Sequence, residues 1–318
     1  MSFRIIGTGM HVPSKVVTND DLAQIVDTND EWISKRVGVR ERRFSEEEFT
    51  SDLGLKAAQN ALENAGIKPE ELDAIFAATV SGETSSPSMS CMIQKGLGAS
   101  CLAMDVSAAC SAFLFLLETA AAFFTLHQDF KKILVVGTER MSGILDFADR
   151  STCVIFGDGA GAAVLERGTN YLDSVFTVRG NDTVIKIPHG IGNSPYFKRE
   201  QDTPYIHMQG QETFKYAVNS ISQDITTLLE RNHLTADDIA WIVPHQANKR
   251  IIDFSAKKLN IPKEKFFCNI EKYGNTSSAS VPIALDELAR SGNLKRGDKI
   301  ILCAFGAGLS NAACLIEW

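Results

Sequence analysis

The chain has 318 residues, of which 44% are hydrophobic and 22% charged, with a net charge of -7 at neutral pH. It is longer than one typical core supports, so we expect two domains, or two halves that share a core. The acidic balance argues against a nucleic-acid partner, because nonspecific binding to nucleic acid favours a basic domain.

The seven cysteines are scattered and odd in number, and none forms a C-x-x-C pair. A disulfide framework or a zinc site is therefore not expected, and the pattern favours a reducing, cytoplasmic environment. No paired histidines have metal-ligand spacing, and no Walker or Rossmann motif follows a strand, so we expect neither a metal nor a resident cofactor. The N-terminal apolar run is too short for a signal peptide.

Helical patterns at 52–65 and 211–232 alternate with short apolar strand candidates. Residues 62–76 (LENAGIKPEELDAIF) and 229–243 (LERNHLTADDIAWIV) match at an offset of 167. Each predicts the end of a helix, a turn and a buried strand. A weaker second match pairs ILVV and FGDG, at 133–136 and 156–159, with IILC and FGAG, at 300–303 and 305–308. We therefore expect a duplicated α/β protein with halves 1–170 and 171–318 and mixed sheets covered by helices.

Cys110 follows a predicted strand at 101–106 and opens a predicted helix, in the segment DVSAACSAF (105–113). Free N–H groups and the helix dipole at such a junction favour a thiolate, the nucleophilic form of cysteine. The apolar run 108–126 is nearly long enough to span a bilayer, but it lacks basic flanks. We expect a core helix lying between two sheets and covered on every side, and no membrane association.

His245 ends a predicted strand in VPHQAN (243–248), just before a helical pattern at 247–259. Active groups of α/β proteins often lie at such strand ends. Asn275, in GNTSSAS (274–280), precedes a small-residue run at 276–288 and taken alone also fits a turn or a helix cap. The FGAG segment at 305–308 lets the backbone approach a substrate closely, although it also fits a generic tight turn.

At these residues the sequence closely resembles ketoacyl-acyl-carrier-protein synthase III, the condensing enzyme that starts bacterial fatty acid synthesis. The most specific motifs are DEWI (30–33), GVRER (38–42), FGDGAGAA (156–163) and the two segments around His245 and Asn275. Only residues 180–204 look divergent. The resemblance implies a thiolase-like duplicated fold, with five α/β/α/β/α layers and two mixed sheets around buried central helices.

The resemblance implies that Cys110 takes an acyl group from acyl-coenzyme A. His245 and Asn275 would bind the thioester carbonyl of malonyl-acyl carrier protein and stabilise the enolate that decarboxylation leaves. The backbone N–H groups of Cys110 and Ala307 would form the oxyanion hole. The family's coenzyme A contacts map onto Trp32, Arg36, Arg150, Gly210, Phe214 and Asn248. Its docking site for acidic carrier protein maps onto Lys215, Arg250, Lys257 and Lys258.

The sequence departs from the family pattern at two positions. Where members restricted to short primers often carry a bulky aromatic that reaches across a homodimer and closes the acyl pocket, this chain has Ser86. We therefore predict an acyl pocket that accepts primers longer than acetyl. The second departure is Asn311, where the family commonly has tryptophan.

The sequence is also compatible with three other functions. The first is an acyltransferase, or a condensing enzyme of secondary metabolism, with the same fold; the pair of His245 and Asn275 argues for enolate stabilisation rather than for simple acyl transfer. The second is a Cys–His thioesterase, which would need a carboxylate beside His245. A noncatalytic carrier-binding homologue is the third, and it would be expected to have lost Cys110.

Overall fold

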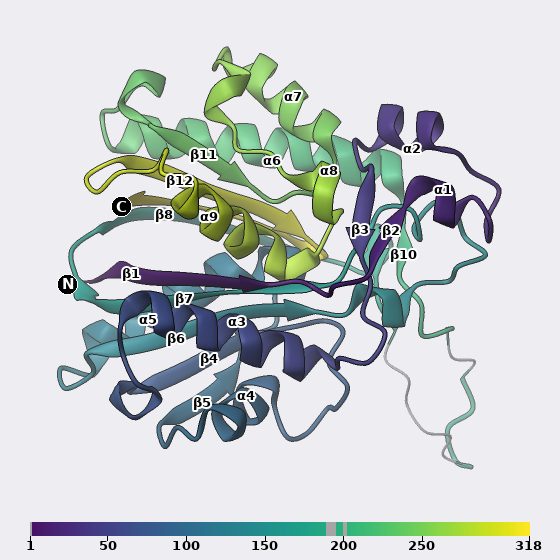
Figure 1. Ribbon diagram of the computed structural model, residues 1–318. Helices are drawn as coiled ribbons and strands as arrows, with labels where there is room; N and C mark the ends of the chain where they lie inside the picture. Colours follow the sequence, from purple (N-terminus) through teal and green to yellow (C-terminus); the bar gives the residue numbers. More distant parts are fainter. Residues whose placement is uncertain (1, 189–194, 200–201) are drawn as a thin grey trace.

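A computed structural model describes residues 2–188, 195–199 and 202–318 (Figure 1). The elements of the first half are β1 (Ser2–His11), β2 (Val16–Thr18), α1 (Asn19–Leu22), α2 (Asp30–Arg36), β3 (Glu41–Arg43), α3 (Thr50–Ala65), η1 (Pro69–Glu71), β4 (Ala74–Ala78), α4 (Met89–Leu97), β5 (Leu102–Asp105), η2 (Ala109–Ser111), α5 (Ala112–Leu126), β6 (Lys132–Glu139), η3 (Met141–Ile144) and β7 (Gly159–Gly168). Those that follow are β8 (Tyr171–Asn181), β9 (Ile185–Lys186), β10 (His207–Met208), α6 (Gly210–Arg231), η4 (Ala236–Asp238), β11 (Trp241–Pro244), α7 (Lys249–Leu259), η5 (Lys263–Lys265), α8 (Ile270–Tyr273), η6 (Ser277–Ala279), α9 (Ser280–Arg290), β12 (Lys299–Gly306) and β13 (Gly308–Glu317).

The two main sheets repeat one topology. The first has the strand order β1-β7-β6-β4-β5, and the second has β8-β13-β12-β11. In the first sheet, β4 follows α3 and pairs in parallel with β6, whereas the pairs β6–β7 and β7–β1 are antiparallel. In the second sheet, β11 follows α6 and pairs in parallel with β12, whereas the pairs β12–β13 and β13–β8 are antiparallel. The predicted duplication is therefore confirmed. We infer that the halves join between the end of β7 and the start of β8, close to residue 170.

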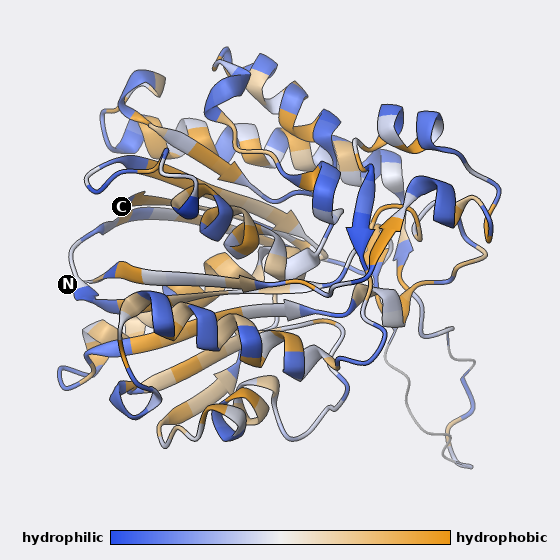
Figure 2. Ribbon diagram, viewed as in Figure 1, coloured by the Kyte–Doolittle hydropathy of each residue, from blue (hydrophilic) through white to orange (hydrophobic). Residues whose placement is uncertain are grey.

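Helices cover both sheets and fill the space between them. Helix α3 packs on β1, β6 and β7 from outside, and α6 packs on β12 and β13. Helices α5 and α9 lie between the sheets and contact strands of both, which gives the five predicted layers (Figure 1). Hydrophobic residues follow the strands, whereas the outer helices carry hydrophilic residues (Figure 2). The largest apolar cluster joins α5 and α9 to both sheets, so burial between the sheets holds the halves together.

Residues 109–126 are long and apolar enough to cross a membrane, with a mean hydropathy of 1.8. In the structure α5 packs on β1, β4, β6 and β13, as a core helix does. The expectation that it is covered on every side is wrong for its C-terminal turns, because Leu126 is 75% exposed in the single chain.

Candidate active site

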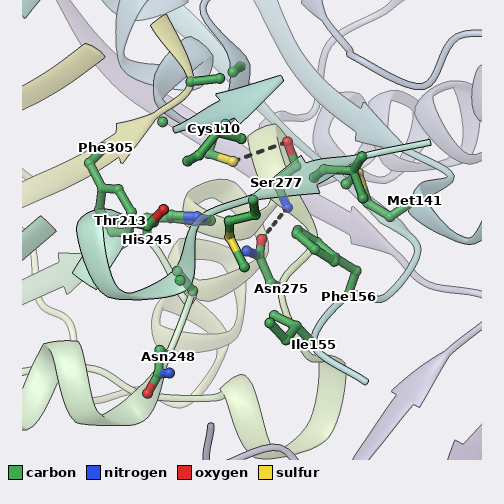
Figure 3. Close-up of a pocket in the computed structure, with 18 of the residues that line it drawn as sticks. Cys110, Met141, Ile155, Phe156, Thr213, His245, Asn248, Asn275, Ser277 and Phe305 are labelled. Atoms are coloured by element: carbon green, nitrogen blue, oxygen red, sulfur yellow. Dashed lines mark hydrogen bonds between the residues drawn. The ribbon is translucent and has the colours of Figure 1, made fainter. Parts of the chain in front are cut away.

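Side chains from both halves line one cavity of about 140 Å³ (Figure 3). Cys110 enters it from η2, His245 from the loop after β11, and Asn275 from the loop before η6. The structure thus brings together three residues that are far apart in sequence. Four other predicted site residues line the same cavity: Ala307, Gly210, Phe214 and Asn248.

Cys110 lies between β5 and α5, as predicted, in a short 3-10 turn whose first residue, Ala109, has a φ of 48°. Its Sγ donates to Ser277 Oγ over 3.5 Å. Burial raises the pKa of the Cys110 thiol to about 12. Burial therefore opposes the thiolate that the helix N-terminus was expected to favour, and the resting group is a thiol.

His245 is buried, and its backbone N–H donates to Cys303 O over 2.8 Å, which anchors it to β12. Its ring lies edge-on to Phe305, with the ring centroids 5.3 Å apart. Burial lowers the pKa of His245 to about 3, so the imidazole is neutral at physiological pH.

The Nδ1 atom of His245 is buried and has no hydrogen-bond partner among the described residues. An unpaired lone pair is tolerated inside a protein more readily than an unpaired N–H. We therefore assign the ring hydrogen to Nε2, which makes His245 a hydrogen-bond donor toward the cavity.

Asn275 is fixed through its backbone and its side chain. Its N–H donates to Ile155 O over 2.9 Å, and its carbonyl accepts from Gly157 N over 3.0 Å. The side-chain Oδ1 accepts from the backbone N–H of Ser277 over 2.8 Å (Figure 3). Because Oδ1 is occupied in this way, the amide nitrogen is the part of the side chain left to bind a carbonyl in the cavity.

The turns of Cys110 and Ala307 are tied to each other. Ser310 Oγ lies 3.0 Å from Ala307 O, to which it donates, and 2.8 Å from Ser111 Oγ. Gly306 lies so close that a Cβ on it would be 2.8 Å from Cys110 N. Only glycine permits this approach, which brings the backbone of the Ala307 turn next to the nucleophile.

A second, open cavity of about 710 Å³ is bordered by Trp32, Arg36 and Arg250. The guanidinium carbons of Arg36 and Arg150 lie 4.9 and 5.5 Å from the centre of the Trp32 ring, within cation–π range. The predicted group of Trp32, Arg36 and Arg150 is therefore assembled. Asn248 joins it to the first cavity, because its side chain caps α7 and donates to Arg36 O over 3.1 Å.

The predicted basic residues lie on α6 and α7, the helices that also carry Phe214 and Ile251 of the first cavity. Arg250 lies over the ring of Phe214, 5.5 Å from its centre. Lys215 pairs with Glu212 over 2.9 Å, and Lys258 donates to Asn219 over 2.6 Å. Lys257 is exposed about two turns beyond Arg250 on α7. Arg250, which is predicted to bind carrier protein, also borders the Trp32 cavity and so lies beside residues predicted to bind coenzyme A.

The two departures from the family pattern lie outside the first cavity. Ser86 is exposed and does not line the cavity of its own chain. Asn311 is buried on β13, opposite Phe305 of β12. Its amide donates to Asp224 over 2.6 Å and accepts from Tyr216 Oη over 2.7 Å, while burial raises the pKa of Asp224 to about 6. Part of the divergent stretch, residues 189–194 and 200–201, lies outside the described residues.

Sequence reasoning missed three polar residues that hold the site. Ser277 contacts both Cys110 and Asn275. Gln246 is buried next to His245, and its side chain bonds to four backbone groups. Glu139, at the end of β6, bonds to Ser278 beside the Asn275 loop. Their only sequence signal was adjacency to a motif or a strand end, and many structural residues share it.

Within the described ranges, no group of three or more His, Cys, Asp or Glu side chains is arranged to hold a metal ion. The donors in the first cavity are a thiol, a neutral imidazole and a carboxamide, which suit hydrogen bonding to a carbonyl oxygen.

Comparison with known proteins identifies the family. The profile described as 3-Oxoacyl-[acyl-carrier-protein (ACP)] synthase III matches residues 104–180, and that of its C terminal matches residues 229–318. The chain is 46% identical to beta-ketoacyl-[acyl-carrier-protein] synthase III of Clostridium acetobutylicum, over 100% of this chain and 99% of the relative.

Solved structures agree with that match. The crystal structure of 3-oxoacyl-[acyl-carrier-protein] synthase III from Aquifex aeolicus superposes with a TM-score of 0.93 at 42% identity, and both chains are covered completely. A priming beta-ketosynthase of the R1128 polyketide pathway superposes with a TM-score of 0.90 at 35% identity, over 99% of this chain and 96% of the other. The chain therefore belongs to the 3-oxoacyl-[acyl-carrier-protein] synthase III family of acyl-transferring condensing enzymes.

Proposed function

We propose that the protein joins an acyl-coenzyme A primer to malonyl-acyl carrier protein by a decarboxylating Claisen condensation and so initiates fatty acid synthesis. The observation that carries this proposal is the single cavity lined by Cys110, His245 and Asn275, with His245 Nδ1 unpaired. A thiol can hold an acyl group, and two neutral donors can stabilise an enolate without a metal or a strong base.

The first stage loads Cys110. Its sulfur attacks the thioester carbonyl of acyl-coenzyme A, a new carbon–sulfur bond forms, and the old one breaks. The proton of the Cys110 thiol ends on the sulfur of coenzyme A. The backbone N–H groups of Cys110 and Ala307 stabilise the oxyanion of the tetrahedral intermediate, a role supported by the ties between their two turns.

The second stage uses His245 and Asn275. Their N–H groups donate to the thioester carbonyl oxygen of the malonyl group, and the bond to its carboxylate breaks to release CO2. The electron pair passes into an enolate, whose carbon attacks the acyl carbonyl on Cys110. The carbon–sulfur bond to Cys110 then breaks, the thiol regains a proton from water, and 3-oxoacyl-carrier protein leaves.

The environment of His245 argues against a Cys–His thioesterase. A general base in such an enzyme keeps its Nε2 lone pair by donating Nδ1–H to an orienting group. Here Nδ1 has no partner among the described residues, and burial keeps the imidazole neutral with a pKa of about 3. His245 is therefore better suited to donate a hydrogen bond than to accept a proton.

The two substrates would use adjoining surfaces. The adenine of coenzyme A would stack on Trp32 beside Arg36 and Arg150, and its pantetheine arm would pass Asn248, Phe214 and Gly210 to reach Cys110. The carrier protein, which is acidic, would dock on Lys215, Arg250, Lys257 and Lys258 around the same opening. Complementary charge would speed the encounter and fix its orientation.

We further propose a cytoplasmic homodimer. In the single chain, Leu102 on the edge strand β5 and Val178 on the edge strand β8 are 40% and 61% exposed. Exposed apolar side chains on edge strands favour association with a second copy. Ser86 would then act on the acyl pocket of the partner subunit, which fits its position outside its own cavity. Sedimentation should give twice the chain mass of 34.7 kDa, and a monomer would exclude this role of Ser86.

A role in secondary metabolism is the second candidate, and the similarity to a polyketide priming ketosynthase favours it. That role uses the same chemistry with another primer or carrier protein. The two are separated by comparing a fatty-acid carrier protein with a polyketide carrier protein as malonyl donors.

The direct test of the function is incubation with acetyl-coenzyme A and malonyl-acyl carrier protein, followed by mass spectrometry of the carrier-bound product. We expect 3-oxobutanoyl-carrier protein and one CO2 per turnover, and no condensed product from Cys110→Ala. Free acid in place of the condensed product would indicate a thioesterase.

A further inference from the structure

Glu139 is a buried carboxylate beside the site that takes no part in the proposed chemistry. It is the last residue of β6 and is 0% exposed. Burial raises its pKa, and hydrogen bonds from surrounding donors oppose that shift. Burying a carboxylate costs several kcal/mol unless donors compensate, so these partners indicate what the residue does.

One oxygen of Glu139 holds the turn after β4. Oε2 accepts from Ser81 Oγ at 2.6 Å, from Val80 N at 3.0 Å and from Thr79 Oγ1 at 3.1 Å. Val80 lines the same cavity as Cys110. This oxygen therefore fixes a wall of the cavity that belongs to the first half.

The other oxygen holds the Asn275 loop, which belongs to the second half. Oε1 accepts from Ser278 Oγ at 2.7 Å and lies 3.4 Å from Ser278 N. The residue before it in that loop, Ser277, donates its N–H to Asn275 Oδ1 and accepts from Cys110. Strand β6 packs tightly here, because a Cβ on Gly137 would lie 2.5 Å from Ser278 O. Glu139 thus holds Ser278, the residue next to Ser277, and Ser277 in turn orients the side chain of Asn275.

We propose that Glu139 is a positioning residue for decarboxylation. It joins the two halves and holds Asn275 in the orientation that binds the malonyl carbonyl. This inference rests on the proposed function, since it assigns Asn275 to that carbonyl. A carboxylate is suited to the place because every partner donates, including two backbone N–H groups that cannot reverse. Its negative charge opposes ionisation of Cys110, so its benefit is geometric rather than electrostatic.

The test compares Glu139→Ala, the near-isosteric Glu139→Gln and Ser278→Ala. Acyl loading of Cys110 is measured by intact mass, and CO2 release is measured in a single turnover of the preloaded enzyme with malonyl-carrier protein. Asp286→Asn is the matched control, because Asp286 is also a buried carboxylate but bonds Thr8 and Arg290 outside the cavity. The extent of loading also measures the fraction of enzyme that is folded. The ratio of the rate of CO2 release to the rate of loading is therefore independent of losses in folding.

We expect Glu139→Ala to slow CO2 release about 10- to 100-fold, the scale of a catalytic group displaced by up to 1 Å, while loading changes far less. Glu139→Gln should slow CO2 release by a smaller factor, because its amide NH2 must face the backbone N–H of either Val80 or Ser278. The double variant of Ser278→Ala and Glu139→Ala should lose no more than the worse single variant. A crystal structure of Glu139→Ala should show the 2.8 Å contact between Ser277 N and Asn275 Oδ1 opened.

Equal losses in loading and CO2 release, additive effects of the two substitutions, or an undisturbed Asn275 would overturn the inference. The crystallographic comparison decides it even if the wild-type protein condenses no substrate. Absence of condensation by the wild-type protein would instead reject the proposed function. The two failures are therefore distinguishable.

Discussion

Gly306→Ala should impair the loading of Cys110 while leaving the fold intact. The added Cβ would lie 2.8 Å from Cys110 N, 3.2 Å from Ser111 N and 3.3 Å from Cys110 Cβ. Nonbonded atoms of this kind prefer a separation of about 3.5 Å or more, so the two turns must part by roughly 0.5 to 1 Å. A displacement of that size at reacting groups costs up to about 100-fold in rate. We therefore expect acyl transfer from coenzyme A to slow by roughly 10- to 100-fold.

The assay is a time course of intact protein mass after mixing with acetyl-coenzyme A. Gly180→Ala is the control, because a Cβ at that position meets no atom within 4 Å. Circular dichroism and a thermal melt establish that both variants fold. A wild-type loading rate in folded Gly306→Ala would refute the argument that the contact between β12 and η2 positions the nucleophile.

Three further outcomes are expected. The pKa of buried His245, lowered to about 3, means that the unfolded chain binds a proton below pH 6.5 that the folded chain does not, so stability falls as pH falls from 6.5 toward 3. In urea titrations, the free energy of unfolding of the wild type should fall by about 2 kcal/mol between pH 7 and pH 5, and His245→Gln should lack this loss. An equal loss in the wild type and in His245→Gln would contradict the argument from burial. In competition among acetyl-, butyryl- and octanoyl-coenzyme A, the enzyme should accept primers longer than acetyl, and strict acetyl preference counts against the role given to Ser86. Arg250→Glu should weaken use of malonyl-carrier protein far more than loading from coenzyme A, and rising ionic strength should slow the wild-type carrier reaction. Because Arg250 also borders the Trp32 cavity, Lys257→Glu is the cleaner variant, and unchanged carrier kinetics in both would leave this surface without a docking role.

Much of the fold was predictable because its signals are local and repeated. The matched segments at 62–76 and 229–243 each form the end of a helix, a 3-10 turn and a strand in the structure. Periodicity also gave α3, α6 and α7 to within about two residues, the usual uncertainty of helix ends. The open side of α5 could not be predicted, since an apolar helix looks the same whether its last face meets a sheet or a second chain.

The site was predictable where a residue type is rare in its setting. A cysteine opening a helix and a histidine ending a strand stood out, and the structure brings Cys110 and His245 into one cavity. The protonation states were not predictable, because they depend on burial that only the assembled halves create. Glu139 was also missed for this reason, since its partners lie about 60 and 139 positions away in sequence.

The proposed mechanism requires that Cys110 carries the acyl group while His245 and Asn275 act only on the malonyl group. The most direct measurement is the intact mass of four proteins, the wild type, Cys110→Ala, His245→Ala and Asn275→Ala, first with acetyl-coenzyme A and then with malonyl-carrier protein. We predict one acetyl adduct on the wild type and on the last two variants, none on Cys110→Ala, and discharge of the adduct about 100- to 1000-fold slower in His245→Ala and Asn275→Ala than in the wild type. An adduct that persists in Cys110→Ala, or loading that collapses together with discharge in the other two variants, would contradict the account.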